Sequence, residues 1–166
     1  MHPIAEKVQA MFPDTFVRAT EALGELAVFV KKEAVVPVCR FLSGDPVLAF
    51  DFLSDIFSVD YPSDPERFEV TYLLYSIRRH HRLKLKTRVT EADCRVDSVT
   101  GIWQGANFLE REVYDMMGIR FTGHPDLRRI MLPEEFEGWP LRKDFPTEGR
   151  GWRHTFPFLP TFEREG

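Results

Sequence analysis

The sequence predicts an α+β fold: a small mixed or antiparallel sheet packed with two or three helices, followed by an extended C-terminal arm rich in proline and aromatic residues. Three observations lead to this prediction. Alternating strand patterns cluster in the first hundred residues, the strongest helical periodicity follows at 102–117, and regular patterns stop after Gly118. We therefore divide the chain at that glycine into an α+β domain over 1–118 and an arm over 119–166.

The composition is that of an ordinary globular protein. The chain has 166 residues, of which 43% are hydrophobic and 29% charged, and its formal net charge is −4. A domain of this length buries roughly 70% of its unfolded surface, so it needs no disulfide or metal to fold. No apolar run approaches the roughly 18 residues of a membrane span, and the first residues show no signal-peptide pattern. We expect a soluble protein in a reducing compartment, with no direct membrane span.

The first part of the chain is expected to form two helices and two strand regions. The segment 3–13 predicts a short helix, because Pro3 suits a first helical turn and apolar residues follow at helical spacing. The segment 24–30 ends in an apolar run typical of a strand. The segment 35–43 predicts a second helix, which a Ser-Gly-Asp-Pro sequence ends. The apolar and aromatic segment 50–61 is expected to give one strand or two short ones.

Two strands joined by a hairpin are predicted next. The segment 68–75 is apolar on both faces in its second half, which is typical of a strand inside a sheet. The segment 82–89 alternates sharply between an apolar and a basic face; the two faces carry Leu83, Leu85, Thr87 and Val89, and Arg82, Lys84, Lys86 and Arg88. The polar tetrad at 78–81 between the two segments favours a direct antiparallel connection.

The longest helix is predicted over 102–117. Its apolar residues recur at intervals of three and four and draw one stripe, formed by Ile102, Ala106, Leu109, Val113 and Met116. Ser98 or Thr100 could cap its first turn. Gly118 suits the left-handed position that commonly follows a helix end.

The arm over 119–166 combines two compositional features that rarely occur together. Its 48 residues hold six of the twelve prolines and eight of the 22 aromatic residues. A disordered tail is poor in aromatic residues, and a compact domain seldom contains so long an irregular segment. We therefore expect an extended arm that buries its aromatic side chains on another subunit; the alternative is an arm folded back on its own domain.

The basic face of 82–89 is the first candidate binding site. With Arg78 and Arg79 it places six cations in eleven residues without an acid, and such a surface could follow a nucleic-acid backbone. The alternative is neutralisation by a neighbour, because the segment 45–66 supplies six acidic residues and no cation. Since the net charge is negative and no nucleic-acid-binding motif is present, we expect no nucleic-acid partner.

Histidine and cysteine residues give no pattern typical of a metal site or a catalytic centre. Cys39 and Cys94 are 55 residues apart, which excludes a four-cysteine cluster, and Cys39 is expected to pack inside. His124, beside a proline, is expected to make a structural hydrogen bond. A free-standing enzyme that uses His124 and Asp126 is the alternative of a different class. We expect no catalytic residue, cofactor or metal in this chain.

The long helix carries two carboxylates on the shoulders of its apolar stripe. Glu110 and Glu112 fall about 160° apart around the helix axis, so they cannot reach one small atom together. We expect these acidic shoulders to meet basic partners as the helix docks. Arg111 and Asp115 lie on the opposite face, spaced for an i,i+4 ion pair.

A long and gap-free signature begins at Glu110. The segments 110–121 (EREVYDMMGIRF), 123–133 (GHPDLRRIMLP) and 137–146 (EGWPLRKDFP) resemble the 30-kDa, or C-type, subunit family of respiratory complex I, the proton-pumping NADH:quinone oxidoreductase. The segments 59–62 and 67–70 are similar to this family as well. The resemblance covers about residues 20–146.

The resemblance implies a hydrophilic subunit of the peripheral arm of the complex. Such a protein holds no cofactor of its own, although the complex as a whole implies FMN, iron–sulfur clusters and quinone. Its partners would be the 49-kDa subunit, which is related to the hydrogenase large subunit, and the iron–sulfur subunits. It would lie on the cytoplasmic face of a bacterial inner membrane, or less expectedly on the mitochondrial matrix side. The same domain occurs in related membrane-bound hydrogenases and in ferredoxin-dependent quinone reductases, which remain alternatives.

The chain would thus be part of an oxidoreductase and translocase, as a non-catalytic structural or assembly subunit that braces the quinone-site and iron–sulfur subunits. We expect the signature to provide docking and positioning charges and the positions that shape the interface. These candidate residues are Glu110, Arg111, Glu112, Asp115, Gly118, Phe121, Gly123, His124, Pro125, Arg128, Arg129, Pro140, Leu141, Arg142, Lys143 and Asp144.

Overall fold

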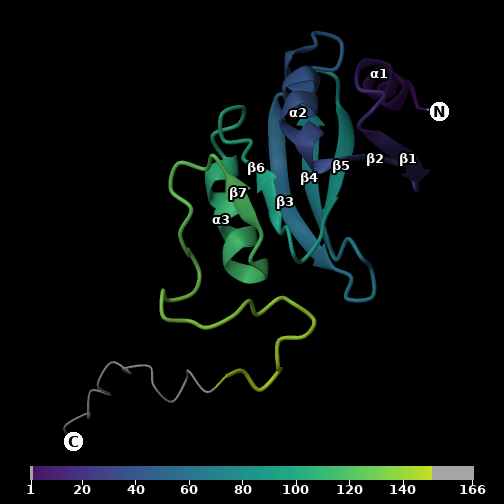
Figure 1. Ribbon diagram of the computed structural model, residues 1–166. Coiled ribbons are helices and arrows are strands. Elements are labelled where there is room, and N and C mark those ends of the chain that lie inside the picture. Colours follow the sequence, from purple (N-terminus) through teal and green to yellow (C-terminus); the bar gives the residue numbers. More distant parts are fainter. Residues whose placement is uncertain (1, 151–166) are drawn as a thin grey trace, which may run out of the picture.

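A five-stranded mixed sheet forms the centre of the protein, as the computed structural model shows for residues 2–150, the part of the chain that it describes (Figure 1). The strands are β1 (Phe16–Ala22), β2 (Glu25–Val30), β3 (Phe52–Asp60), β4 (Phe68–Ser76) and β5 (His81–Val89). Their order across the sheet is β1-β2-β5-β4-β3, and β2 and β5 are the one parallel pair among them. The predicted α+β class with a mixed sheet is confirmed.

The predicted hairpin joins β4 to β5. The two strands pair along their full lengths, from Phe68 opposite Val89 to Ser76 opposite His81. In β5 the apolar face is buried and the basic face is partly exposed, as the alternation predicts. In β4 the core-facing side chains include the fully buried Tyr72. The segment 50–61 forms one strand, β3, with an irregularity near its start.

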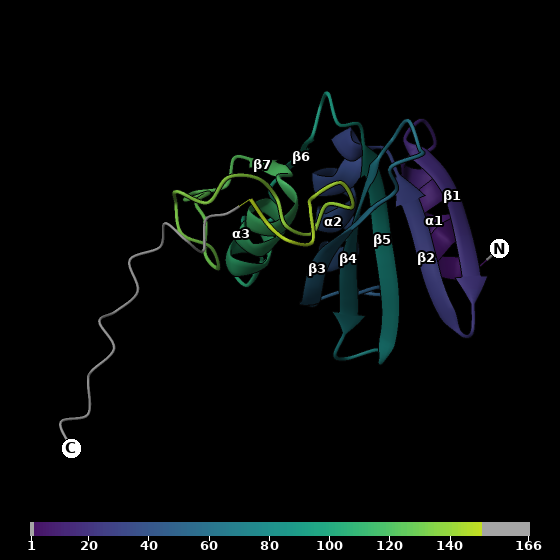
Figure 2. The same ribbon diagram turned by 90° about the horizontal axis from the view of Figure 1, so that it is seen from below.

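Two of the predicted helices cover one face of the sheet. They are α1 (Pro3–Met11) and α2 (Val35–Gly44), the latter preceded by a single 3-10 turn, η1 (Lys32–Ala34). Seen from below, both helices lie behind the strands (Figure 2). Their apolar side chains join those of the sheet in one core, and Cys39 on α2 is buried there as predicted.

The third helix, α3 (Ala106–Met117), lies beside β3 at the edge of the sheet (Figure 1). It begins four residues later than the periodicity suggests, and the expected cap by Ser98 or Thr100 is wrong. The N-cap position is Gly105, which makes no side-chain bond. Residues 99–103 form a turn instead, in which the amides of Ile102 and Trp103 donate to the Val99 carbonyl. The helix ends as predicted, at Gly118 in the left-handed conformation with φ of 75°.

Three strands have no counterpart in the sequence-based prediction. One is β1, an edge strand whose side chains are mostly exposed and which therefore lacks an apolar pattern. The others are β6 (Arg95–Asp97) and β7 (Arg120–Thr122), which form a separate parallel pair. Because β7 follows α3 directly, this pairing returns the chain to the domain immediately after Gly118.

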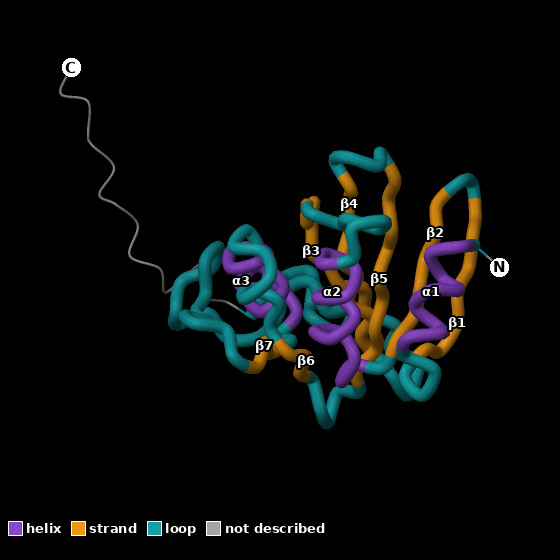
Figure 3. Tube along the Cα trace, turned by 90° about the horizontal axis from the view of Figure 1, so that it is seen from above, coloured by secondary structure: helices purple, strands orange, loops and turns teal. Residues whose placement is uncertain are grey.

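The described part of the arm folds back on its own domain, which corrects the expectation of an arm extended on a partner. After β7, residues 123–150 run as a loop around α3 (Figures 1 and 3). The backbone amide of Leu141 donates to Met116, and Phe136 is 6% exposed. Phe136 is thus buried within the chain, and Trp139 and Phe145 are partly buried there. The remaining aromatic residues of the arm, at 152–162, lie outside the described residues. Within residues 2–150, no helix is long and apolar enough to cross a membrane.

Candidate partner interface around helix α3

The buried carboxylate of Asp115 organises the segment that follows helix α3. Its Oδ2 accepts hydrogen bonds from three successive backbone amides, those of Ile130 (3.0 Å), Met131 (2.7 Å) and Leu132 (3.0 Å). Its Oδ1 accepts from Nη1 of Arg129 at 2.7 Å. Burial alone would raise the pKa of Asp115, but these four donors favour the anion and leave its pKa below the usual range.

Arg129 joins α3 to the loop over residues 136–139. Its Nη2 donates to the carbonyls of Phe136 (2.9 Å) and Gly138 (3.2 Å), while Nη1 reaches Asp115. Its guanidinium lies over the Trp139 ring, 4.7 Å from the centroid. One side chain therefore fixes three separate parts of the chain, which suits the rigid donor geometry of arginine.

The ion pair expected between Arg111 and Asp115 is not formed. Arg111 instead donates to the backbone carbonyls of Arg128 and Arg129, both at 3.3 Å. Arg129 takes its place because the loop at 129–132 covers this face of α3 and removes Asp115 from solvent. A buried ion pair that makes several hydrogen bonds stabilises the fold more than an ion pair between neighbouring turns on the helix surface, which contributes only a few tenths of a kcal/mol.

The C-terminal end of α3 is capped by residues far along the chain. The Met117 carbonyl accepts from Nε of Arg142 at 2.8 Å, and the Met116 carbonyl accepts from the amide of Leu141 at 3.1 Å. Gly118 makes this approach possible: a Cβ there would lie 2.6 Å from the Trp139 ring and 2.8 Å from Nη2 of Arg142. The helix end, which carries unpaired carbonyls and a partial negative charge, is thus satisfied by a cation.

Glu110 is buried without a basic partner, which corrects the expectation that its carboxylate meets a cation. Its Oε2 accepts from the Ser98 hydroxyl and its Oε1 from the Val99 amide, both at 2.7 Å. Burial raises the pKa of Glu110 to about 7, although these two bonds favour the anion. Glu110 therefore holds the turn before α3 in place, whereas Glu112 on the other shoulder is exposed.

A second ionic centre joins the sheet to the loop at 142–144; of its members, the sequence singled out Lys143 and Asp144 but not Arg67, Asp60 or Glu91. Arg67 donates to both oxygens of Asp60, at 2.8 and 2.9 Å, and to Glu91 at 2.9 Å. It also contacts the carboxylate of Asp144 at 3.1 Å, and the Lys143 amide donates to Asp60. The Arg67 guanidinium lowers the pKa of Asp60. The sequence signal was weak, because these residues are far apart along the chain.

His124 has the structural role that its sequence context predicts. Its Nδ1 accepts from the Asp126 amide at 3.0 Å, so Nε2 carries the proton that bonds the Asn107 carbonyl, also at 3.0 Å. Pro125 and Gly123 beside it are exposed, and Phe121 is buried. This histidine ties the loop after β7 to the first turns of α3.

Apolar side chains point outward over the same region. Phe108 on α3 is 62% exposed, and Met131 in the loop bonded to Asp115 is 63% exposed. Ile130 and Leu141 are also exposed. We call these four residues the α3 apolar patch. Exposed apolar side chains gathered in one region of a protein surface typically mark an interaction site.

Three of the four cations on the basic face of β5 are paired with acids, but only one of these acids, Asp64, comes from the segment 45–66 that was expected to supply them. Lys86 and Arg88 both bond Glu69, at 2.7 and 3.1 Å, and Arg88 also bonds Asp64 at 2.6 Å. Lys84 pairs with Glu25. These ion pairs reduce the positive charge that the strand could offer to a nucleic-acid backbone. Among residues 2–150, no three His, Cys, Asp or Glu side chains are grouped to hold a metal ion.

The sequence matches the family model described as the 30-kDa subunit of the respiratory-chain NADH dehydrogenase over residues 28–151. The chain belongs to this family. The match begins in β2 and includes every element from η1 onward, so it takes in both ionic centres and the segment around α3.

Relatives and solved structures agree with this family. The C-type subunit of NADH-quinone oxidoreductase from Roseiflexus sp. (strain RS-1) is 46% identical over 153 residues, which cover 92% of this chain and 88% of the relative. A C-type subunit of the same enzyme from Rhizobium meliloti is 52% identical over 128 residues, covering 77% of this chain and 70% of the relative. The trypsin-resistant fragment (1–134) of Nqo5 superposes with a TM-score of 0.62 at 36% identity, over 74% of this chain and 95% of the fragment.

A further structure shares the fold alone. A chain of the membrane-bound sulfane sulfur reductase, an archaeal respiratory membrane complex, has a TM-score of 0.73 at 20% identity, covering 98% of this chain and 94% of that one. The 30-kDa subunit fold is therefore found in respiratory membrane complexes of more than one kind.

In this 30-kDa family chain, the signature residues divide into internal and outward groups. Glu110, Asp115, Gly118 and Phe121 are buried, and Arg111, His124, Arg129, Pro140 and Arg142 are partly buried. The outward group is Glu112, Gly123, Pro125, Arg128, Leu141, Lys143 and Asp144.

Proposed function

We propose that this chain is the 30-kDa subunit of a proton-translocating NADH:quinone oxidoreductase and acts there as a non-catalytic structural and assembly component. It braces the 49-kDa subunit, which forms the quinone site, and the neighbouring iron–sulfur subunits within the peripheral arm. FMN, the iron–sulfur clusters and quinone belong to those other subunits. The chain lies on the cytoplasmic face of a bacterial inner membrane, held there through its partners.

The proposal is supported most by what the polar side chains of the family signature bond in the structure. Asp115, Arg129, Arg142 and Glu110 each bond backbone groups of this chain and hold α3 and the loop around it in one arrangement. A catalytic group needs a side chain that faces a substrate, whereas these side chains are engaged in holding a surface. The relatives from NADH-quinone oxidoreductases support the same role.

The α3 apolar patch is the surface through which this chain contacts the 49-kDa subunit. Phe108 lies on α3 itself, and the other three members lie in loop segments whose backbone amides bond Asp115 and Met116 of this helix, on which Glu112 is also exposed. An apolar centre with charged residues around it is the usual composition of a stable protein interface. Arg128 and Lys143 are exposed and supply charge at its margin.

Co-purification tests the proposal directly. A tagged copy of the full chain, recovered from its native membranes in mild detergent, should bring down a hydrogenase-like subunit and iron–sulfur subunits with NADH:quinone activity. Recovery of the chain alone, free of such subunits, would contradict the proposal. Recovery with a hydrogenase or a ferredoxin-oxidising partner would assign it to a related complex.

A further inference from the structure

Every residue other than glycine that has a positive φ within residues 2–150 lies at one end of the sheet. These residues are Leu23, Ala49 and His80, with φ of 53°, 46° and 53°. Leu23 lies in the turn between β1 and β2, and His80 lies in the turn between β4 and β5. Because β2 and β5 are parallel, the turns that precede them lie at the same end of the sheet (Figures 2 and 3).

Ala49 belongs to this end because the loop before β3 is bonded to the β4–β5 turn. The amide of Ile77 donates to Oδ1 of Asp51 at 2.9 Å, and the carbonyl of Leu48 accepts from Nε2 of His81 at the same distance. Strained backbone of this kind gathers at functional sites. Its concentration at one end of the sheet therefore points to a function there.

Leu23 is the strongest of the three outliers. Ala22 pairs with Glu25, so Leu23 and Gly24 form a two-residue turn with positive φ at both positions. The first position of such a turn favours asparagine, aspartate or glycine. Leu23 is also fully exposed, so its side chain gains nothing from burial within the described part of the chain. Conformation and exposure both oppose folding, as expected of a side chain that another molecule covers.

The β4–β5 turn adds apolar and basic side chains to this end. Ile77 is 54% exposed. Arg78, Arg79 and Arg82 are exposed and form no ion pair with the described residues. In a chain of formal net charge −4, three free cations within five residues form a local basic surface.

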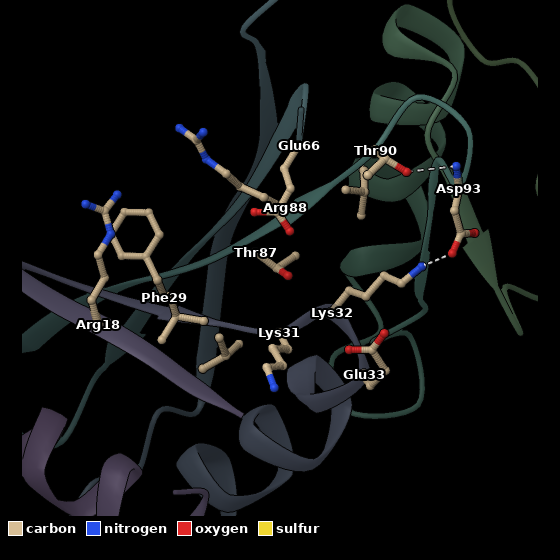
Figure 4. A pocket seen from close by; sticks show the side chains of 13 residues that line it. Arg18, Phe29, Lys31, Lys32, Glu33, Glu66, Thr87, Arg88, Thr90 and Asp93 are labelled. Carbon is tan, nitrogen blue, oxygen red and sulfur yellow. Dashed lines mark hydrogen bonds and ion pairs between the residues drawn. The ribbon is translucent and has the colours of Figure 1, made fainter. Parts of the chain in front are cut away.

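Cations at the opposite end of the sheet are mostly engaged within the chain. They line a pocket of about 560 Å³ beside β2 and β5 (Figure 4). Lys32 pairs with Asp93, and the Arg18 guanidinium covers the Phe29 ring at 4.0 Å from its centroid. Lys31, which is exposed and has no ion pair among the described residues, is the exception. This end therefore offers less free charge than the three arginines of the β4–β5 turn.

Strain, apolar exposure and free cations thus occur together at the hairpin end, the name we give to Leu23, Ile77, Arg78, Arg79 and Arg82. Since neighbouring strands are about 4.8 Å apart, the two turns lie roughly 10–15 Å from each other, within reach of one partner surface. Exposed apolar residues with arginine, and without free lysine, are the composition enriched at protein interfaces. Three cations are fewer than the roughly four to eight that form a basic site for anionic lipid.

We propose that the hairpin end docks on an acidic surface of a partner subunit. Carboxylates of the partner accept hydrogen bonds from the three arginines, and an apolar recess between them covers Ile77 and Leu23. This second interface rests on the proposed function, because the partner belongs to the same complex. It is separate from the α3 apolar patch, which contains no residue of these turns.

Arginine modification compares the isolated full chain with the purified complex. Phenylglyoxal should react with Arg78 and Arg82 several-fold more slowly in the complex, as measured by mass spectrometry of the peptides. Equal rates in a fully assembled complex would overturn the hairpin-end interface and leave the proposed function standing. If no complex is recovered, the proposed function fails and this interface fails with it.

Charge reversal tests whether the partner surface is acidic. Arg78→Glu should weaken reassembly with the partner subunits about tenfold or more, because like charges then meet. Lys31→Glu is the control, since it makes the same change of charge at the opposite end of the sheet, and it should weaken reassembly less than about twofold. Equal losses in the two variants would contradict the proposal.

Leu23→Asn should have effects of opposite sign on the isolated chain and on the complex. Asparagine suits the turn, so the melting temperature of the isolated chain should rise by about 2–4 °C. Reassembly should weaken about three- to tenfold, because an apolar contact with the partner is lost. A variant that is more stable but reassembles normally would contradict a partner contact at Leu23.

Ile77→Ser should weaken reassembly to a similar extent. Its control is Val17→Ser, which changes a residue that is 57% exposed near the opposite end of β1. Equal effects of these two variants would contradict an apolar contact at Ile77.

Vesicles distinguish a protein partner from a lipid surface. The isolated chain should not co-sediment with vesicles of phosphatidylglycerol. Co-sedimentation that Arg78→Glu abolishes would assign the hairpin end to anionic lipid and overturn the proposal.

Discussion

Nη1 of Arg129 lies 2.7 Å from Oδ1 of Asp115, and both side chains are almost fully buried. The arginine comes from the loop after β7 and the aspartate from the last turns of α3, so this ion pair fixes the loop to the helix. Charges buried in this way are favourable only when their remaining bonding capacity is filled. Here three backbone amides and two carbonyls complete it.

Asp115→Asn should therefore destabilise the fold strongly. The substitution leaves Arg129 buried without its counter-charge, and we expect the free energy of unfolding to fall by about 3–5 kcal/mol in urea titrations. Asp126→Asn is the control, since its ion pair with Arg128 is exposed and should be worth less than about 1 kcal/mol. A similar loss in both variants would show that burial of the Asp115 pair is unimportant.

Gly118→Ala should also destabilise the fold, for two reasons. The residue has φ of 75°, and a Cβ would lie 2.6 Å from the Trp139 ring. Gly123→Ala shares the first reason, with φ of 81°, but its Cβ meets nothing within 4 Å. We expect the two variants to differ by about 1–3 kcal/mol in unfolding free energy, which is the cost of the displaced tryptophan. Equal losses would mean that Trp139 does not pack against Gly118.

The buried Glu110 should make stability depend on pH near neutrality. Its pKa is about 7 in the folded chain against an ordinary value of 4.5, so the folded state binds the proton more tightly. The contribution of Glu110 to the free energy of unfolding is therefore complete when the pH is below its ordinary pKa. It is lost as the pH rises through about 7. At pH 8 the buried carboxylate is charged and costs stability.

Glu110→Gln should remove this dependence. An amide oxygen can still accept from Val99 and the amide nitrogen can donate to Ser98, so we expect a gain of about 1–3 kcal/mol at pH 8 that shrinks toward pH 5. Urea titrations across this range measure it, with Glu112→Gln as the exposed control. A variant equally destabilised at every pH would show that the carboxylate itself is required.

Arg67→Lys should weaken the ionic centre between the sheet and the loop at 142–144. A lysine cannot reproduce the paired bonds to Asp60 together with those to Glu91, and we expect a loss of about 1.5–3 kcal/mol in unfolding free energy. Arg95→Lys, at an exposed pair with Asp93, should change little. Comparable losses at the two positions would contradict a special role for Arg67.

Residue patterns within one segment predicted those helices and strands whose bounds depend on residues close together in the sequence. The alternation over 82–89 placed the hairpin and its buried face, and Gly118 marked the end of α3. The start of that helix could not be located, because the apolar stripe continues into a turn that Val99 organises. Edge strand β1 was missed because its residues face solvent.

Contacts between distant segments could not be predicted from periodicity. The helical spacing of Arg111 and Asp115 favours a local pair, but the loop at 129–132 brings a better donor to the carboxylate. Likewise the pattern places Glu110 at the edge of the apolar stripe without showing that Ser98 lies opposite. The parallel pair β6–β7 consists of three-residue strands, too short to give a signal.

We propose that this chain holds the complex together and performs no chemistry in it. The most direct measurement is quinone reduction per assembled complex for Phe108→Ser combined with Met131→Ser, beside the control Val17→Ser, which changes an exposed apolar residue on another part of the surface. We predict that the double variant lowers the yield of assembled complex, while each complex that forms reduces quinone at the normal rate. Normal assembly with lost quinone reduction would contradict the account.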